Sequence, residues 1–361
     1  MKEEQIIRVG MVVRADQTGL GNQSQDWVRN LPIKKVLVAW GEGKKSDPSF
    51  YSQVEMRVCE YGIPTIEEID WLLTDIDLVL TIETPYNWNL IKKAKDKGVK
   101  SIIAPNYEQL PEMIPAQPDL WLCYNLLNYQ QVPFENKVYV PQPIDRTAFQ
   151  FKKRKKARIF LFNNGNGGMH GRNCLKEFIE AIYLSTADVK FIINSQVQVD
   201  SINDSRVEVH LGDLPIAEIW KEGDVFVHLR KFGALSLPQN EAMSLGMPCL
   251  MVNRVPESIF MPNKLLVEPS DKYIFRCRKD TISIEAKVIS PTEIAKKIDE
   301  LANTDISEYS ETMDKIADEW SWNNLRGNWI GIFVNLITGN PQKNYEHKIS
   351  QASDSSQKEE L

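Results

Sequence analysis

Short apolar runs alternate with amphipathic segments along the chain, and this alternation starts twice. The runs IIRVGMVV, KKVLVAW, DLVLTI, KSIIAP, LWLCY and KVYVPQ have the composition of buried strands, and residues 87–99 have the periodicity of a helix. After residue 150 the strand candidates are ARIFLFNN, VKFIINSQ, VEVHL, DVFVHL and PCLMVN, with helices predicted at about 172–184, 215–222 and 239–245. Such alternation is typical of parallel sheets covered on both faces. The sequence therefore predicts an α/β protein with two doubly wound domains in series.

The segment VPQPIDRTAFQFKKRKKAR carries two prolines and then a charge run near the middle of the chain, which is typical of a domain joint. We therefore predict one domain at 1–145 and a second at 146–320. An aromatic helix is predicted at 321–338, because apolar residues recur there at spacings of three and four. These residues are Trp322, Leu325, Trp329, Ile332, Phe333 and Leu336. Residues 339–361 are polar, and we expect a disordered, dispensable tail.

The composition is that of a soluble globular protein, with 42% hydrophobic and 25% charged residues among 361. The formal net charge of −6 disfavours a dedicated nucleic-acid binder, although it leaves room for a local basic groove. The five cysteines have no C-x-x-C spacing and indicate reduced thiols in a cytoplasmic protein. The sequence shows no signal peptide and no apolar run of the ~18 residues that a membrane helix needs.

The stretch FGALSLPQNEAMSLGMPCL, residues 232–250, places a small-residue turn between a strand and a helix. Exposed amides at such a helix start attract an anion such as a phosphate. Glu241 is predicted in the first helical turn, where it can accept hydrogen bonds from neutral hydroxyls such as those of a ribose. The alternative is that Glu241 only complements the helix dipole.

The loop NNGNGGMHGRN also follows a strand and precedes a helix. Its glycines, among them Gly165 and Gly167, allow backbone amides to approach a phosphate closely. Arg172 supplies a fixed charge with paired donors, and Arg230 or Lys231 adds a cation from the neighbouring loop. The alternative is a plain turn capped by Asn173.

Two further loops are predicted at carboxyl ends of strands in the first domain. The loop at 14–27 carries Asp16, Gly19, Gly21 and Asn22, and it lacks the third glycine of a dinucleotide fingerprint. The segment LTIETPYNW presents Glu83, a candidate for contacting an acceptor hydroxyl. The alternatives are a capped turn at 14–27 and a helix-capping cluster of Glu83 with Thr84 and Asn87.

Three other signals are set aside. Asp75-Ile76-Asp77 resembles a metal-binding D-x-D, but its setting favours the end of a helix and the start of a strand. The four histidines show no metal-ligand spacing. The basic run at 152–158 is typical of a solvated edge beside a linker, with a nucleic-acid surface as the alternative.

The segment GDVFVHLRKFGALSLPQNEAMSLGMPCLMVN resembles the donor-binding signature of retaining glycosyltransferases of family 4, which have the GT-B fold. Leu237-Pro238, Glu241, Ala242-Met243 and the Gly246–Pro248 turn match that signature in spacing. Gly233 stands where the family has another glutamate. VYVPQPIDRTAF resembles the family's domain-joining segment, and the glycine-rich loop with Arg172 resembles its phosphate-facing loop. The resemblance covers about 138–335, and the N-terminal half only as a fold.

This resemblance implies a GT-B architecture, in which two Rossmann-like domains face each other across a cleft. The first domain would be the acceptor side, the second would bind the nucleotide-sugar, and the helix at 321–338 would cross back to the first. It further implies a hexosyl- or pentosyltransferase that moves a sugar to a hydroxyl acceptor with retention, without metal or cofactor. Arg172, Glu83 and Asp16 are then the candidate catalytic residues. The candidate donor-binding residues are Glu241, Arg230, Lys231, Gly165, Gly167, Gly233, Ala234, Leu235, Ser236, Leu237, Gly19 and Gly21.

The Arg-Lys-aromatic-Gly run is similar to transferases of bacteriophage and related bacterial genomes, which implies a hydroxylated base of phage DNA as one acceptor class. Two alternatives remain open. One is a sugar-phosphate epimerase of the same fold. The other is a non-catalytic sugar-nucleotide-binding protein, of which Gly233 would be a sign.

Overall fold

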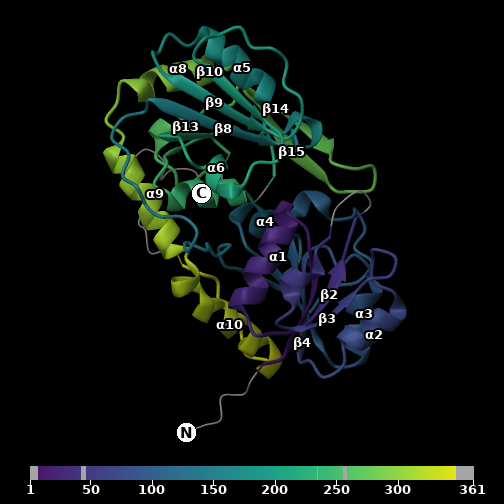
Figure 1. The fold of residues 1–361 in the computed structure, drawn as a ribbon. Helices are drawn as coiled ribbons and strands as arrows, with labels where there is room; N and C mark the ends of the chain where they lie inside the picture. The colour runs from purple at the N-terminus through teal and green to yellow at the C-terminus, as the bar shows by residue number, and fades with distance from the viewer. Residues whose placement is uncertain (1–6, 42–45, 234, 255–257, 347–361) are drawn as a thin grey trace. The chain divides into compact units, whose positions relative to one another are not determined.

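Two parallel sheets organise the computed structural model, which describes residues 7–41, 46–233, 235–254 and 258–346 (Figure 1). The chain forms two compact units. Of the described residues, unit 1 holds those up to Pro143 together with 278–282 and 322–346. Unit 2 holds the remainder. Each unit is described by itself below.

Unit 1 contains a seven-stranded parallel sheet with the order β3-β2-β1-β4-β5-β6-β7. The strands are β1 (Val9–Arg14), β2 (Ile33–Ala39), β3 (Glu55–Val58), β4 (Leu78–Glu83), β5 (Lys100–Pro105), β6 (Leu120–Cys123) and β7 (Lys137–Tyr139). The helices are α1 (Gly19–Asn30), α2 (Ile66–Leu72), α3 (Asn89–Asp96), α4 (Leu126–Gln131) and α10 (Trp322–Thr338). Strand order reverses between β1 and β4, and folds of this kind bind ligands at the carboxyl ends of the strands beside that point.

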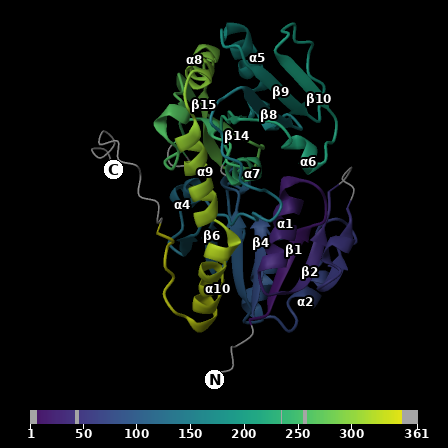
Figure 2. The ribbon, with the colours of Figure 1, turned by 60° about the vertical axis from the view of Figure 1, so that its left-hand side comes forward.

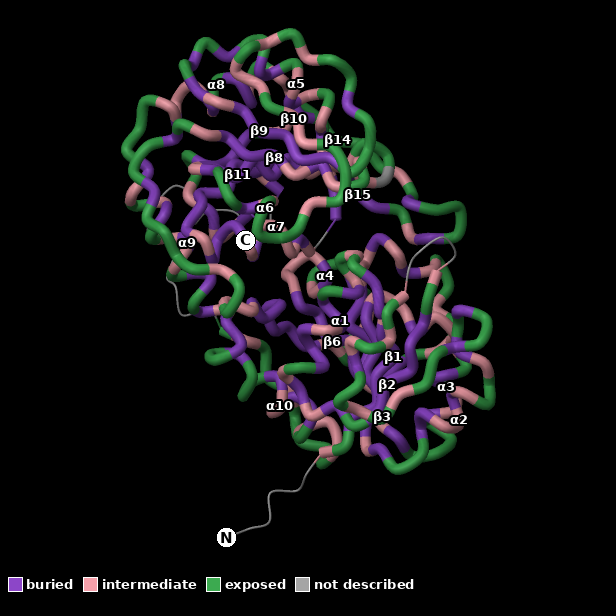
Figure 3. Tube along the Cα trace, viewed as in Figure 1, coloured by how far each residue is buried: buried purple, intermediate pink, exposed green. Residues whose placement is uncertain are grey.

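Unit 2 contains a six-stranded sheet with the order β10-β9-β8-β11-β12-β13, also parallel. Its strands are β8 (Ile159–Gly165), β9 (Lys190–Ser195), β10 (Val207–Leu211), β11 (Val225–His228), β12 (Cys249–Val252) and β13 (Leu266–Val267). The helices are α5 (Leu175–Leu184), α6 (Ile216–Ile219), α7 (Leu237–Ser244), α8 (Pro291–Ala302) and α9 (Ser307–Glu319). The reversal in strand order falls between β8 and β11. Residues of both sheets are mostly buried, as Figure 3 shows, so the apolar strand runs of the sequence do form the cores.

An antiparallel hairpin, β14 (Asp271–Arg276) with β15 (Ser283–Val288), lies outside both parallel sheets. Its inner face packs on two loops of unit 2. The Phe275 ring lies 4.6 Å from that of Phe232 and 5.5 Å from that of His170, and the His170 ring nitrogen Nε2 bonds to the Cys277 carbonyl at 3.0 Å. The sequence did not predict this hairpin, because its strands alternate charged and apolar residues and have no helix between them.

Helix α10 packs on unit 1, whereas the preceding α9 belongs to unit 2 (Figure 2). Trp329 is fully buried, and its ring centroid lies 4.7 Å from that of Trp27 on α1. Its neighbour Trp322 donates from Nε1 to Asp26 at 2.8 Å. The apolar stripe of the C-terminal helix is therefore covered by α1 and by the segment after β7, where the Pro141 carbonyl accepts from Trp329.

Part of the segment that the sequence predicts as a disordered tail, residues 339–361, is bound to unit 1 in the structure. Asn344 accepts from the amide of Tyr139 at 2.9 Å, and the Tyr345 amide donates to the Tyr139 carbonyl at 2.8 Å. The segment up to Glu346 thus adds one side-chain and one backbone hydrogen bond to β7, the last strand of its sheet. Composition did not indicate this contact, because the edge of a strand presents unpaired backbone groups that polar residues can hydrogen-bond without burying apolar surface. The remainder of the predicted tail, 347–361, lies outside the described residues.

We expect a chain that ends at Gly339 to be measurably less stable than one that ends at Glu346. Each hydrogen bond to β7 contributes about 0.5–1.5 kcal/mol, and about 1 kcal/mol lowers the Tm of a domain this size by roughly 2–4 °C. Thermal unfolding of the two truncated proteins and the full chain measures this. The chain ending at Glu346 should match the full chain, and equal Tm values for all three would contradict the contact with β7.

Candidate functional site

The loop between β8 and α5 has the backbone that a close approach to a ligand requires. Gly165, Gly167 and Gly168 have φ values of 55°, 85° and 71°, and His170 adopts 53° although it carries a side chain. Side-chain and backbone bonds hold this shape, since Asn173 donates to the Asn164 carbonyl at 2.8 Å. Asn173 therefore closes the loop and does not cap α5, whose N-cap is Cys174.

Arg172 ends this loop and is held against the next one. The amide of Lys231 donates to the Arg172 carbonyl at 2.9 Å, and the Arg172 guanidinium lies 5.8 Å from the centre of the Phe232 ring. The structure thus brings together the two loops that the sequence predicts as phosphate-facing. Both follow neighbouring strands, β8 and β11, at the reversal in strand order.

The loop between β11 and α7 holds its two predicted cations differently. Arg230 donates to the Leu235 carbonyl at 2.6 Å, and this bond fixes the guanidinium over the turn. Lys231 forms an ion pair with Glu177 of α5 at 2.7 Å, so its charge is already balanced. Gly233 has a φ of 100°, which a glutamate at this position would adopt only with strain. Ala234 lies outside the described residues.

The start of α7 offers fewer backbone donors than predicted. Ser236 caps the helix and accepts from Gln239, Asn240 also donates to Ser236, and Pro238 has no amide hydrogen. Leu237 is the first helical residue. Side-chain cations therefore have to supply most of any anion binding here.

Glu241 lies in the second turn of α7 and not in the first, because the helix begins at Leu237 and its first turn contains no acidic residue. Glu241 therefore does little to complement the helix dipole, since a carboxylate beyond the first turn gains little from that dipole. Trp220 donates from Nε1 to one Glu241 oxygen at 2.8 Å. Burial raises the pKa of Glu241 to about 7, against the effect of that hydrogen bond.

Sequence reasoning missed two residues at the same edge of the sheet. Arg254, which follows β12, is 7% exposed and donates to the Gly233 carbonyl at 2.9 Å. His228 is the last residue of β11 and is 8% exposed. Arg230, Arg254 and Arg172 all act electrostatically on the His228 ring. The available signal was position: each residue lies at or just after the carboxyl end of a strand, next to the strand-order reversal.

In unit 1 the carboxyl end of β4 carries the predicted residue Glu83. Glu83 and Tyr86 have φ values of 68° and 58°, an uncommon backbone for residues with side chains that clusters at functional sites. Asn106 of the next strand end donates to Glu83 at 3.2 Å. Burial raises the pKa of Glu83, with Asn106 opposing the rise and Glu108 adding to it. Asn87 donates to the Pro64 carbonyl and accepts from the amide of Asn89, the first residue of α3, so the Asn87 part of the helix-capping alternative is present.

The loop after β1 is shorter than predicted, since α1 begins at Gly19. Asp16 accepts from the Arg14 guanidinium through one carboxylate oxygen and from the Thr18 amide and hydroxyl through the other. A side chain at Gly21 would lie 1.8 Å from the Asp16 carbonyl, while Gly19 faces open space. Thr18 also caps α1. Asp16 and Gly21 thus build the turn into α1, as the capped-turn alternative supposed, and the group that they orient is Arg14.

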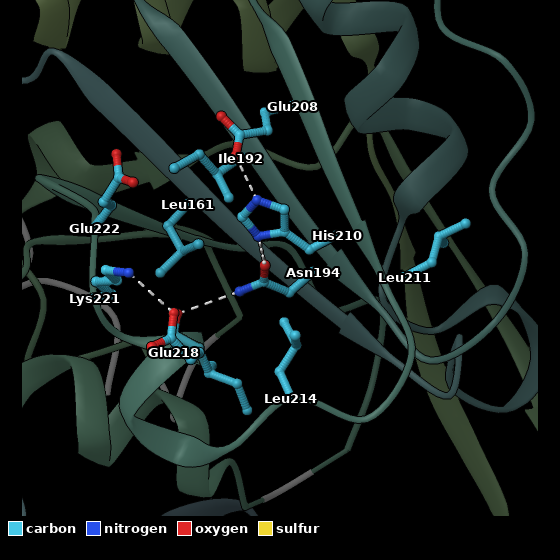
Figure 4. Close-up of a pocket in the computed structure, with 11 residues that line it drawn as sticks. Leu161, Ile192, Asn194, Glu208, His210, Leu211, Leu214, Glu218, Lys221 and Glu222 are labelled. Atoms are coloured by element: carbon cyan, nitrogen blue, oxygen red, sulfur yellow. Dashed lines mark hydrogen bonds and ion pairs between the residues drawn. The ribbon is translucent and has the colours of Figure 1, made fainter.

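A separate hollow of about 410 Å³ lies on the unit 2 sheet beside α6 (Figure 4). Leu161 and Ile192 form its apolar floor. His210 bonds to Asn194 at 2.9 Å and to Glu208 at 2.5 Å along one wall. Helix α6 spans four residues where the sequence predicts about eight, and this short helix leaves the sheet face partly uncovered. None of the predicted site residues lines the hollow.

The remaining predicted features are placed as follows. Arg154 of the basic run is 7% exposed and binds the Gly223 and Leu245 carbonyls, so it is a structural residue. Asp77 pairs with Arg8 at the start of β4, in agreement with the structural interpretation of the D-x-D. In the described part of the chain, no group of three or more His, Cys, Asp or Glu residues could hold a metal ion. Over the same residues, no helix combines the length and apolarity that crossing a bilayer requires.

The fold defined by these two sheets is the GT-B fold, as comparison with solved structures shows. By sequence, no protein-family model and no curated protein matches the chain. The galactosyltransferase of the lipopolysaccharide outer core, WaaB, is similar with a TM-score of 0.63 and 13% identity, over 92% of this chain and 99% of WaaB.

Anabaena HepE in complex with UDP and glucose is similar with a TM-score of 0.63 and 9% identity, over 91% of this chain and 100% of HepE. Sucrose-phosphate synthase of Thermosynechococcus elongatus gives a TM-score of 0.59 and 10% identity, over 92% of this chain and 100% of that protein. At these identities the similarities establish the two Rossmann-like domains and leave function to the site itself.

Proposed function

We propose that this protein is a glycosyltransferase that moves a sugar from a nucleotide-sugar donor to a hydroxyl acceptor. The observation that carries the proposal is the convergence of Arg172, Arg230 and Arg254 on the carboxyl edge of the unit 2 sheet. Cleavage of a nucleotide-sugar leaves a diphosphate, and preorganised cations stabilise the charge that develops on it. Two similar GT-B structures, the galactosyltransferase WaaB and HepE in complex with UDP and glucose, agree with this assignment.

Glu241 would bind donor hydroxyls. It lies on α7, the helix that follows the loop of Arg230, and Trp220 fixes one of its carboxylate oxygens there. In unit 1, Glu83 would contact the acceptor hydroxyl, since its strained backbone and buried carboxyl mark a preorganised position. Because arginines would stabilise the leaving diphosphate in the way that a divalent cation does in other enzymes, we propose a reaction that needs no metal. Retention of configuration, the class of sugar transferred and an acceptor in hydroxylated phage DNA rest on the sequence resemblance alone.

The test is binding and turnover in the Glu241→Ala protein. A charge-assisted hydrogen bond is worth about 1.5–3 kcal/mol, so we expect a roughly 10- to 100-fold loss of affinity for UDP, ADP or GDP, whichever the wild type binds. The anionic carboxylate accepts these bonds, and the pKa of Glu241 is raised to about 7. The ratio of variant to wild-type Kd should therefore grow as pH rises from 6 to 8. Isothermal titration calorimetry measures both effects.

Glu180→Ala is the matched control, because Glu180 lies on α5 with a half-exposed side chain and should leave binding unchanged. Turnover is followed by mass spectrometry of nucleotide-sugars with EDTA present and with glycan or hydroxymethylated-DNA acceptors. Donor binding without transfer or hydrolysis would support a sugar-nucleotide-binding protein instead. Failure of every nucleoside diphosphate to bind the wild type would contradict the proposed function.

A further inference from the structure

His228 has a buried ring nitrogen, Nε2, that the described part of the fold leaves without a hydrogen bond. It is 8% exposed, and its Nε2 atom has no hydrogen-bond partner among the residues that the structure describes. The ring stacks on Phe226 of the same strand, with centroids 5.4 Å apart and an angle of 21° between planes. Buried polar atoms in proteins are almost always hydrogen-bonded, and a buried nitrogen without a hydrogen-bond partner is destabilising. This nitrogen is therefore a candidate for bonding to a ligand.

Within the described ranges, three positive charges act on the His228 ring. Arg230 follows it on the loop after β11, Arg254 comes from the loop after β12, and Arg172 comes from the loop before α5. Burial, together with these three guanidinium groups, holds the pKa of His228 well below the usual histidine value. From α6, Trp220 packs on the same Phe226 ring at 5.1 Å and carries the hydrogen bond to Glu241. Without a ligand, the imidazole is accordingly neutral at neutral pH.

A neutral imidazole among arginines becomes easier to protonate when an anion binds beside it. Burial is the largest cause of the lowered pKa of His228, and the field of the guanidinium groups adds to it. The negative charge of a diphosphate offsets that second contribution. A phosphate oxygen is also a strong acceptor for the unused Nε2–H. Both effects favour the imidazolium form in the complex.

We propose that His228 donates a hydrogen bond from Nε2 to a phosphate oxygen of the bound nucleoside diphosphate and takes up one proton from solvent as that anion binds. This inference rests on the proposed function, since it takes the diphosphate of the donor as the ligand. The imidazolium becomes a fourth cation on the leaving group, and its proton returns to solvent when the product dissociates. No bond of the substrate is made or broken by this step.

The chain has four histidines, which makes the protonation state directly observable. Protein labelled with ¹⁵N-histidine is titrated at pH 7 with UDP, or with ADP or GDP where UDP does not bind. The His228 resonances are those missing from the His228→Gln protein. We expect the pattern of a neutral ring in the free protein and that of an imidazolium in the complex. A ring that stays neutral in a saturated complex overturns the proposal and leaves the proposed function intact.

Affinity provides a second measurement. Proton uptake on binding means that the wild-type Kd weakens as pH rises from 6 to 8, whereas Kd of His228→Gln lacks this contribution. The titration of the nucleotide itself cancels in the ratio of the two values. We expect His228→Gln to bind about 10-fold more weakly at pH 6, with the difference shrinking toward pH 8. A purely structural role for His228 would instead give a constant ratio.

His210→Gln is the control, because His210 lies on the same sheet, at the wall of the hollow beside α6, and should leave the pH dependence unchanged. A ratio that does not change with pH, or a His210→Gln protein that shows the same loss as His228→Gln, overturns the proposal. If UDP, ADP and GDP all fail to bind the wild type, the result contradicts the proposed function and therefore this inference as well.

Discussion

Replacement of Trp329 by alanine is expected to destabilise unit 1 by about 3–5 kcal/mol, the usual cost of removing a large aromatic side chain from a core. Trp329 is fully buried between two other tryptophans, with ring centroids 4.7 Å from Trp27 and 5.8 Å from Trp322. Its indole nitrogen donates to the Pro141 carbonyl, which would lose its partner in the variant. Truncation would therefore leave both a cavity and an unsatisfied polar group.

Denaturant unfolding, followed by tryptophan fluorescence and by far-UV circular dichroism, measures this loss. Val334→Ala on the same helix is the control, because Val334 is 39% exposed and its truncation should cost little. A Trp329→Ala protein as stable as the control would mean that α10 contributes little to unit 1. Nucleotide binding by unit 2 should survive the Trp329 substitution, because Arg172, Arg230 and Arg254 all belong to unit 2.

Arg172→Ala is expected to lower kcat by about 100- to 1,000-fold, the range typical of losing one preorganised donor to developing charge. The bond from the Lys231 amide holds the backbone of Arg172, and the Arg172 guanidinium lies 5.8 Å from the centre of the Phe232 ring. A cation placed in advance beside the leaving group needs little rearrangement as charge develops on the diphosphate. The loss should thus fall mainly on kcat and less on the KM for the donor.

Arg172→Lys should recover only part of the activity, since a lysine keeps the charge and loses the paired donors. The control is Lys176→Ala, four residues further on, because that side chain is 87% exposed and its removal takes away a cation of the same region. Steady-state rates with saturating donor compare the three proteins. Equal kcat values for Arg172→Ala and the wild type would show that Arg172 does not stabilise the transition state.

The fold was largely predictable because buried parallel strands are continuous apolar runs. DVFVHL and PCLMVN became β11 and β12 with little change in their bounds. Apolar periodicity says less about short or exposed elements, and the edge strand β3, helix α6 and the β14–β15 hairpin were missed or misjudged. Their limits are set by what they pack against, which the local sequence does not contain.

For the candidate site, the sequence predicted Arg172, Arg230 and Glu241, because each lies in a motif between a strand and a helix. Arg254 was missed because its strand is followed by no recognisable motif, and His228 because it ends an apolar run and resembles a core residue. Asp16 was assigned to chemistry on its position alone. The structure shows its carboxylate engaged by Arg14 and Thr18, a local pairing that a one-dimensional motif does not reveal.

The packing of the β14–β15 hairpin on His170 has a consequence for how the protein is made. His170 bonds to the carbonyl of a residue 107 positions later in the chain. On the ribosome, β8 and its glycine-rich loop emerge long before the hairpin that anchors that loop. A nascent chain that ends before β14 contains all six strands of the unit 2 sheet, yet its glycine-rich loop lacks the support of the hairpin. Nucleotide affinity should consequently be acquired late in synthesis, only after the hairpin has left the exit tunnel.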